Sequence, residues 1–543
     1  MQRKLSGWSR LGAVTLAGML VLGACASDEG EQAESEGEGT ETTQPEESGP
    51  IIQAGWVNET DLEPTTGGTL QVTLPAAPFG LDPTVASLGV TTGGAPLTAL
   101  YDTLIRWDQE TGEYSGQLAE SVEHNDDFTQ WTLKLRPDVV FSDGTPVNAD
   151  AVEYSVKRMK GARGSAATYP DYVASYDKPD QQTVVFNMVQ PLSNFDALLS
   201  GELGYVVSPT AVDADPEGFN TKPVGAGPFV LEKFSPDSEL ILVRNDKYTI
   251  SEVPLDGIRF TWNPEQGASV DKLVAGETDM AMLTSVPEEV EAIEAGYPAN
   301  TQLVAGSGLA ISSNPDRDFP GDDARVRQAI SLAIDREAVN GRVNRGNGIM
   351  GEFLFPDSSR LHVDEPFAEY DPEKAKALVE EVKAETGWDG SFKLLTPIPD
   401  DYALAYQALL NNVGFKVTID QVPSFLELVS KTNLGRDFDV SIHVITTYET
   451  NVYQALNRSL SSTSASNYAE YKNPEMDALF DKLRAADTDG AKEVLAEIAA
   501  LWTTEQPFVL TGAQPFTTVT GKNVGGLVST VNGLILFGEA FKA

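Results

Sequence analysis

Cysteine, histidine and long apolar runs are all scarce in this chain of 543 residues. Cys25 is the only cysteine, so no disulfide can form within the chain and its stability must come from packing. The three histidines, His124, His362 and His443, do not pair at the spacing of zinc ligands. After residue 25, no apolar run approaches the roughly twenty residues of a membrane-spanning helix. These absences exclude a disulfide scaffold. They also argue against a zinc site and against a protein embedded in the membrane.

Basic residues are scarce as well. The chain has 38 Lys and Arg against 81 Asp and Glu, a formal net charge of −43, and no basic residue occurs between Arg10 and Arg106. Nucleic-acid binding needs basic side chains that displace counterions, so we expect no nucleic-acid partner. The acidity favours solubility in a salty or exposed setting, and a preference for cationic ligands stays open.

Motifs of catalytic centres are missing too. There is no G-x-S-x-G, no S-x-x-K and no H-E-x-x-H, and carboxylate pairs are too plentiful to indicate general acid–base catalysis. Residues 346–351 have the spacing of a dinucleotide-binding loop but lack its strand–turn–helix context. Residues 316–327 begin like a calcium loop, but Pro320 and Arg327 occupy ligand positions. The sequence therefore predicts no enzyme, no catalytic residue and no cofactor.

The N-terminus combines three basic residues with a short apolar run. Arg3, Lys4 and Arg10 precede the sequence LGAVTLAGMLVLGAC at residues 11–25. This pattern resembles a bacterial lipoprotein signal whose lipobox ends at Cys25. The resemblance implies a signal peptide at 1–24, cleavage before Cys25 and a lipid on its sulfur. The protein would then sit on the outer face of the cell membrane; an ordinary secretory signal stays the alternative.

The segment that follows has the composition of a tether. Residues 26–49 contain nine acidic residues and no aromatic or branched aliphatic side chain. Such a segment cannot bury enough apolar surface to offset its chain entropy. We therefore expect residues 25–66 to form a disordered acidic tether and the folded structure to begin near Gly67.

Strand and helix patterns alternate along the rest of the chain. Apolar alternation or apolar runs predict strands at 69–74, 131–135, 184–186 and 240–243. Helix starts are indicated by capping residues ahead of apolar stripes, at Asn148, Asp322 or Asp323, Asp371 and Asn473. Strands mixed with helices of this length favour α/β lobes.

Four segments together resemble family 5 extracellular solute-binding proteins of ABC importers, the group that binds oligopeptides, dipeptides and nickel. They are FSDGTPVNADAVEYS at 141–155, VGAGPF at 224–229, DARVRQAISLAIDR at 323–336 and YDPEKAKAL at 370–378. Within the first segment, Ala151 and Asn148 replace the usual Asp and Thr. Order and spacing fit from about Gly67 to the C-terminus. We interpret these segments as scaffold that identifies the family rather than as ligand contacts.

The resemblance implies a two-lobed periplasmic-binding-protein-like α/β fold, of class II and the large peptide-binding type. Lobe I would comprise residues 67–308 and 506–543, with an extra subdomain at 98–221. Lobe II would comprise residues 309–505. Two chain crossings at the hinge would let the lobes close around a solute.

Two segments fall at positions that line the cleft in the family. The resemblance implies these ligand-binding residues: Ser87, Leu88, Thr91, Thr92, Thr446, Thr447, Tyr448, Glu449, Asn451 and Tyr453. Glu449 is the nearest candidate for the carboxylate that receives a peptide amino group. The tryptophan and aspartate pattern typical of peptide binders in the second segment is missing.

The function that the resemblance implies is a lipid-anchored receptor that delivers a peptide or peptide-like solute to ABC permease subunits, and acts as a monomer. An oligosaccharide or a chelated metal in the same fold is the main alternative. A secreted hydrolase is a more distant one, and an adhesin or signalling lipoprotein with an unused cleft is another. Thermal shift against peptide and sugar panels separates them, because a bound ligand stabilises a receptor.

Overall fold

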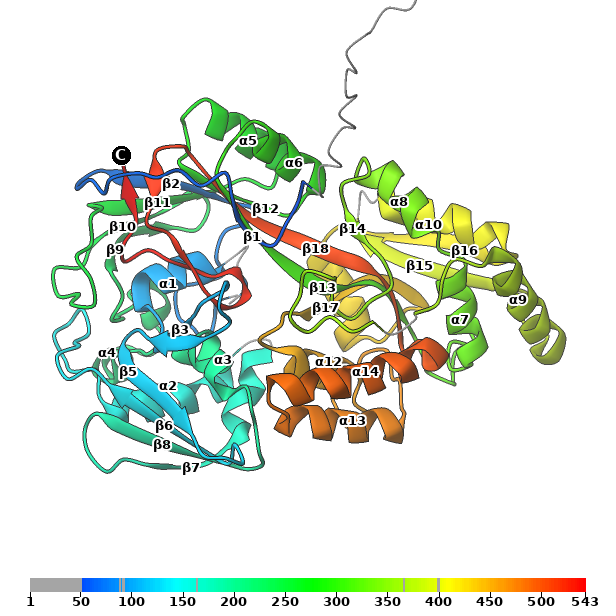
Figure 1. The fold of residues 1–543 in the computed structure, drawn as a ribbon, viewed down its shortest axis with the longest axis horizontal. Helices are drawn as coiled ribbons and strands as arrows, with labels where there is room; N and C mark the ends of the chain where they lie inside the picture. Colours follow the sequence, from blue (N-terminus) through cyan, green and yellow to red (C-terminus); the bar gives the residue numbers. More distant parts are fainter. Residues whose placement is uncertain (1–50, 87–88, 90–92, 163–164, 365–366, 398–400) are drawn as a thin grey trace, which may run out of the picture. The chain divides into compact units, whose positions relative to one another are not determined.

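The computed structural model describes residues 51–543, except 87–88, 90–92, 163–164, 365–366 and 398–400. These residues form a mixed α/β fold built on one sheet of twelve strands (Figure 1). Ten strands follow the order β16-β15-β17-β13-β18-β12-β2-β11-β10-β9, while β1 pairs with β13 and β14 with β18. The strands are β1 Gly55–Val57, β2 Thr69–Leu74, β9 Phe229–Ser235, β10 Glu239–Arg244, β11 Gly257–Trp262, β12 Met280–Leu283, β13 Ala299–Ile311, β14 Ile349–Met350, β15 Ser391–Pro397, β16 Lys416–Val422, β17 Val440–Thr447 and β18 Phe508–Thr520.

Two long strands, β13 and β18, lie next to each other at the centre of this sheet and pair antiparallel. At one end they contribute Ala299 and Val519 to one hydrophobic cluster. At the other end they contribute Leu309 and Val509 to a second cluster. The chain therefore passes between separate cores twice, as the two crossings of a hinge require.

Glycines interrupt the regular pairing of these strands. The register shifts between Ala305 and Gly308, and Gly306 has a φ of +89°. A Cβ on Gly308 would lie 1.9 Å from the carbonyl oxygen of Val509. Only a residue without a side chain allows this close backbone approach, so the bulge is built into the sequence.

A second sheet falls within the predicted extra subdomain. Its order is β5-β6-β8-β7, all antiparallel. These strands are β5 Ala119–His124, β6 Gln130–Leu135, β7 Val173–Asp177 and β8 Thr183–Met188. Short pairs complete the strands: β3 Ile105–Trp107 with β4 Tyr114–Gly116, β19 Val524–Gly525 with β22 Phe541–Lys542, and β20 Val528–Ser529 with β21 Ile535–Leu536.

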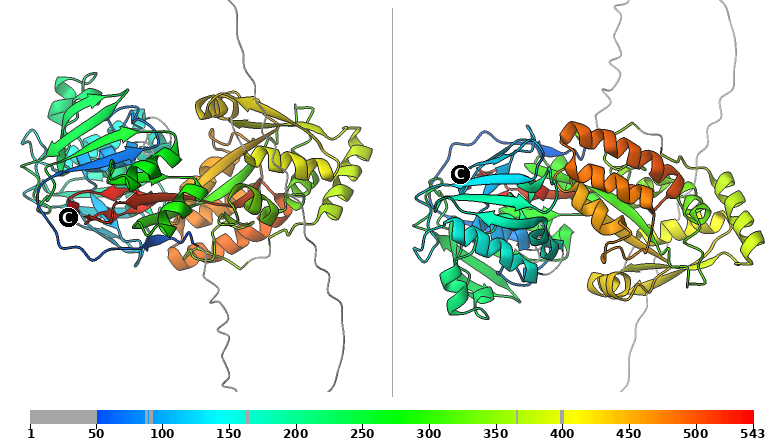
Figure 2. Two further views of the ribbon diagram at one scale, coloured as in Figure 1. Left: turned by 90° about the horizontal axis from the view of Figure 1, so that it is seen from above. Right: turned by 90° about the horizontal axis from the view of Figure 1, so that it is seen from below.

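Helices cover the strands, and α13 and α14 lie side by side (Figures 1 and 2). The helices are α1 Ala95–Tyr101, α2 Ala149–Arg158, α3 Phe195–Leu199, α4 Pro209–Ala214, α5 Gln266–Val274, α6 Val286–Glu294, α7 Ala324–Leu332, α8 Arg336–Val343, α9 Pro372–Thr386, α10 Asp401–Asn412, α11 Phe425–Val429, α12 Val452–Leu460, α13 Pro474–Ala485 and α14 Thr488–Glu505. In the described part of the chain, no helix is both long and apolar enough to cross a membrane.

The capping residues predicted from the sequence begin the helices that they should. Asn148, Asp323, Asp371 and Asn473 each accept a hydrogen bond from a backbone N–H in the first turn of α2, α7, α9 and α13. Gly387 ends α9 with a positive φ of 75°. The four predicted strands are confirmed as β2, β6, β8 and β10. The limits predicted for the lobes and the subdomain stay predictions.

Ordered structure begins before Gly67, so the predicted start was too late. Ile52 is buried and belongs to a cluster with Val286 and Val290 of α6. The next residues form β1, whose Trp56 pairs with Asn300 of the central strand β13. Residues 51–57 are ordered because they supply apolar side chains to this cluster and because β13 has a free edge beside them. The polar residues that follow them have a composition like that of the tether.

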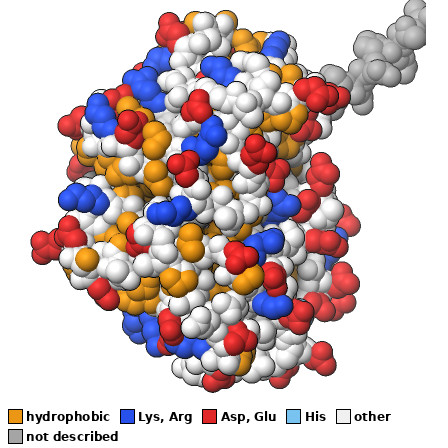
Figure 3. Space-filling view, turned by 90° about the vertical axis from the view of Figure 1, so that its left-hand side faces the viewer, with side chains coloured by type: hydrophobic (Ala, Val, Ile, Leu, Met, Phe, Trp, Pro, Cys, Tyr) orange, Lys and Arg blue, Asp and Glu red, His pale blue; other side chains and the backbone are white. Residues whose placement is uncertain are grey.

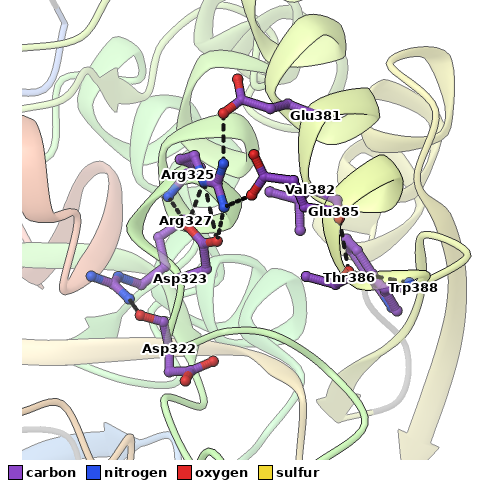
Figure 4. A network of polar contacts seen from close by, with 9 residues as sticks. All are labelled: Asp322, Asp323, Arg325, Arg327, Glu381, Val382, Glu385, Thr386 and Trp388. Carbon is purple, nitrogen blue, oxygen red and sulfur yellow. Dashed lines mark hydrogen bonds and ion pairs between the residues drawn. The ribbon is translucent and has the colours of Figure 1, made fainter.

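The arginines of segment 323–336 have structural roles, as expected for scaffold. Arg325 at the start of α7 donates to Asp323, and to Glu381 and Glu385 on α9 (Figure 4). Arg325 thereby links α7 to α9 through its ion pairs with Glu381 and Glu385. The cluster is partly exposed, so we expect each ion pair to contribute less than about 1 kcal/mol.

Arg327 and Arg336 are buried and fix the path of the chain into β18. Arg327 donates to the carbonyl oxygen of Glu505 at 2.8 Å. Arg336 donates to the carbonyl oxygen of Leu510 at 2.7 Å and pairs with Glu352 at 2.8 Å. The two arginines thus bond to a carbonyl at the end of α14 and to one in β18.

The surface carries charges of both signs. Figure 3 shows Asp and Glu side chains spread among Lys and Arg over one face. A mixed surface of this kind agrees with solubility rather than with an anion-binding patch.

Candidate functional site

The predicted residues of the second segment lie together where β17 leads into α12. Thr446 and Thr447 end the strand, and Asn451 is the residue before the first helical turn. The amide of Tyr448 donates to the side-chain oxygen of Asn451 at 2.8 Å. The oxygen of Asn451 therefore shapes the turn. The other predicted ligand residues, Ser87, Leu88, Thr91 and Thr92, and the predicted lipid site Cys25, lie outside the described residues.

Two tyrosines of this segment are buried beside cavities. Tyr448 is 8% exposed and Tyr453 7% exposed. Burial raises the pKa of both phenols, so each stays neutral and available as a hydrogen-bond donor. The ring of Tyr453 lies 6.5 Å from that of Tyr172, centroid to centroid. Both side chains line cavities that residues of both predicted lobes enclose.

Glu449 is engaged by the segment between β14 and α9. Its Oε1 accepts from the hydroxyl of Ser359 at 2.7 Å and from the amide of Arg360 at 2.8 Å. Its Oε2 pairs with the Arg360 guanidinium at 2.7 Å. The carboxylate is thus already neutralised, and a ligand amine would have to compete with Arg360. Its predicted role in ligand binding stays a prediction.

Two cavities adjoin Glu449. The first has a volume of about 410 Å³ and is lined by five aromatic or imidazole rings, those of Trp107, Tyr114, His124, Phe128 and Tyr453. The second has a volume of about 340 Å³ and extends toward Tyr448, Gln302 and the N-terminal residues Ala54 and Gly55. Each volume falls near the lower end of small-ligand sites.

Asp196, in the first turn of α3, lines the first cavity. One carboxylate oxygen accepts from the amide of Ala197 at 2.8 Å. No ion pair within the described ranges includes Asp196. Burial raises its pKa to about 7, against the lowering effect of the backbone hydrogen bonds. The cavity therefore holds a carboxylate that a cationic group would stabilise.

Hydrogen bonds join the predicted lobes around these cavities. The side-chain amide of Asn194 donates to Gln454 at 2.7 Å and accepts from it at 3.0 Å. The hydroxyl of Thr450 donates to Asn532 at 2.9 Å. The side chains are neutral, so these bonds contribute little net free energy when they are exchanged for bonds to water. They suit a contact that opens and closes.

Metal ligands do not gather in the described part of the chain. No group of three or more His, Cys, Asp and Glu side chains there could hold a metal ion. His443 has Nδ1 bonded to the hydroxyl of Tyr468 at 2.9 Å, and burial lowers its pKa to about 4. It is a neutral, half-buried side chain.

Sequence reasoning did not find Asp196, Arg360 or Asn194. Asp196 is one of 81 acidic residues, and Arg360 lies in an irregular segment with no periodic pattern. Their significance depends on which segments far apart in the sequence come together. A carboxylate at the start of a short apolar helix would have been the only local signal.

Comparisons with known proteins agree with this architecture. The family described as "Bacterial extracellular solute-binding proteins, family 5 Middle" matches residues 113–467, more than half of the chain. The chain belongs to this family. That membership confirms the predicted family, whose members are extracellular solute-binding proteins.

Individual relatives are distant in sequence. The dipeptide-binding protein of Escherichia coli is 28% identical over 337 residues, which cover 58% of this chain and 63% of that protein. The match thus spans less than two thirds of that relative. A probable di/tripeptide-binding protein of Pseudomonas aeruginosa is 27% identical over 69% of this chain and 76% of its own length.

Solved structures confirm the predicted two-lobed α/β fold. A dipeptide-binding protein from a Pseudoalteromonas species, in complex with Met-Leu, superimposes with a TM-score of 0.74 at 21% identity, covering 88% of this chain and 100% of that one. The oligopeptide-binding protein AppA of Bacillus subtilis, in complex with a nonapeptide, gives 0.72 at 22% identity, covering 89% and 100%. At such identities the likeness shows the fold alone.

Proposed function

We propose that this protein is the solute receptor of an ABC importer and binds a short peptide or peptide-like solute with a free amine between its lobes. Family membership supports the receptor role. The relatives named above support peptide as the ligand class. The protein would hold the solute without altering it and deliver it to permease subunits.

The observation that carries the ligand class is Asp196 in its ring-lined cavity. A partly buried carboxylate without a cation is costly, so a ligand ammonium that enters the cavity gains a charge-assisted hydrogen bond. The rings of Trp107, Tyr114 and Phe128 line the same cavity, and aromatic faces attract cations. A neutral sugar can donate hydroxyl groups to the carboxylate and pack on the rings, but it carries no positive charge to balance Asp196.

The remaining parts of the proposal concern the setting of the receptor. The lipobox resemblance supports lipid attachment at Cys25 and a place on the outer face of the cell membrane. The receptor would act as a monomer, since one polypeptide supplies both lobes of the cleft.

Isothermal titration calorimetry with dialanine, trialanine and their N-acetylated forms tests the proposal. We expect the free-amine peptides to bind and the acetylated peptides to bind at least tenfold more weakly. Maltotriose and nickel with histidine serve as the competing ligands. Binding of either one, with no response to any peptide, would reject the peptide class and keep the receptor fold.

A further inference from the structure

Arg360 stands between the two cavities described above. The cavities share four lining residues: Trp107, Arg360, Glu449 and Thr450. Of these, Arg360 has the longest side chain, and it lies 37% exposed, at the boundary of both spaces. The two cavities therefore adjoin along these four residues.

Three contacts hold the guanidinium in this position. It pairs with Glu449 from predicted lobe II at 2.7 Å. It donates to the carbonyl oxygen of Gln109 from predicted lobe I. It also lies over the ring of Trp107, 5.5 Å from the centroid. The arm therefore reaches across the space between the predicted lobes.

The charge of Arg360 is already balanced. Glu449 accepts from both the backbone amide and the guanidinium of the same residue, which fixes the arm at its root and at its tip. A paired guanidinium attracts a further anion weakly. Its effect on a ligand is mainly steric.

We propose that the Arg360 arm, locked by Glu449, is the wall that limits the length of the bound solute. This inference rests on the proposed function. With the arm in place, a ligand occupies the first cavity of about 410 Å³, on the Asp196 side. Without the arm, the second cavity of about 340 Å³ becomes continuous with it. Each further extended residue needs about 3.3–3.6 Å of length, which the second cavity would supply.

Alanine peptides of two to six residues test this wall by calorimetry, with the full chain and the variant Arg360→Ala. We expect the wild-type affinity to fall at least tenfold beyond a limiting length. In the variant this limit should move outward by at least one residue. Glu449→Gln keeps the side-chain shape but releases the arm, and should move the limit in the same direction by a smaller amount.

Arg436→Ala is the matched control. Arg436 has the same 37% exposure and pairs with Glu470 at 2.9 Å, but it lines neither cavity. Its length profile should equal that of the wild type. Identical profiles for the wild type and both cavity variants would overturn the inference.

Crystal structures of the wild type and Arg360→Ala give a readout that needs no ligand. One continuous cavity in the variant supports the wall, and two separate cavities overturn it. If no alanine peptide binds any of the proteins, the proposed function fails. In that case the crystal structures alone test whether Arg360 separates the two cavities. A failure of the proposed function can therefore be distinguished from a failure of this inference.

Discussion

Replacing Asp196 with asparagine keeps the shape of the side chain and removes its charge. If the carboxylate receives a ligand amine, the variant loses one charge-assisted hydrogen bond at a partly buried site. Such bonds contribute about 1.5–3 kcal/mol. Since 1.4 kcal/mol corresponds to a factor of ten, we expect dialanine to bind Asp196→Asn about tenfold to a hundredfold more weakly at pH 8.

The pH dependence of binding gives a second measure of the same group. Because burial raises the pKa of Asp196 to about 7, about nine tenths of the carboxyl groups are ionised at pH 8 and about one tenth at pH 6. The amine of a peptide has a pKa near 8, so it is about half protonated at pH 8 and almost fully protonated at pH 6. The wild-type dissociation constant should therefore rise about fivefold from pH 8 to pH 6, while that of Asp196→Asn should not rise.

The stability of the unliganded protein must change in the matching direction. A raised carboxyl pKa means that the folded state binds more protons than the unfolded state between about pH 4 and pH 7. The wild type therefore loses stability as the pH rises through this window. Urea denaturation should show Asp196→Asn gaining stability relative to the wild type at pH 8, and little difference near pH 4.

Asp102→Asn is the control for these measurements. Burial raises the pKa of Asp102 to about 6, but Tyr248 and Gln117 hold its carboxylate away from the first cavity. Asparagine also tolerates its positive φ of 57°. Binding should keep its pH dependence in this variant. Equal affinities of wild type and Asp196→Asn at pH 8 would refute the assignment of Asp196 to the ligand amine.

Three other predictions concern the hinge, a buried base and the anchor. Gly308→Ala should lower the free energy of unfolding by about 3 kcal/mol in urea titrations, since its Cβ meets the Val509 carbonyl, whereas Gly267→Ala, with open space around it, should be nearly neutral. Because burial lowers the pKa of His443 to about 4, the wild type should lose up to about 3 kcal/mol of stability as the pH falls from 6.5 to 4; the loss should be absent in His443→Gln, and an equal loss would contradict the burial. Expressed in a bacterium fed labelled palmitate, the wild type should incorporate label and Cys25→Ser should not; label in the variant would refute the lipobox assignment.

Local patterns were sufficient to predict many elements of the fold. Asn148, Asp371 and Asn473 cap helices because their side chains satisfy amides of the next turn, which depends only on neighbouring residues. The site depends on distant pairs. Arg360 meets Glu449 across 89 residues of sequence, and no pattern in either segment indicates the other.

The start of the ordered chain shows a different limit. Residues 51–57 are too short and too polar around their apolar members to predict a strand, yet β1 forms because β13 offers an unpaired edge there. The partner decides the conformation, and the partner lies more than 200 residues away. Of the predicted ligand residues in the second segment, Tyr448, Glu449 and Tyr453 line the two cavities, and Thr446, Thr447 and Asn451 line neither. Their role in ligand binding stays a prediction.

The position of β18 sets an order of events during folding. This strand comes from the last 36 residues of the chain, yet it lies between β13 and β12 in the middle of the large sheet. Until β18 is synthesised, the position between β13 and β12 stays empty, and the sheet is incomplete. The large sheet therefore cannot be completed until the final stretch of the chain has been synthesised.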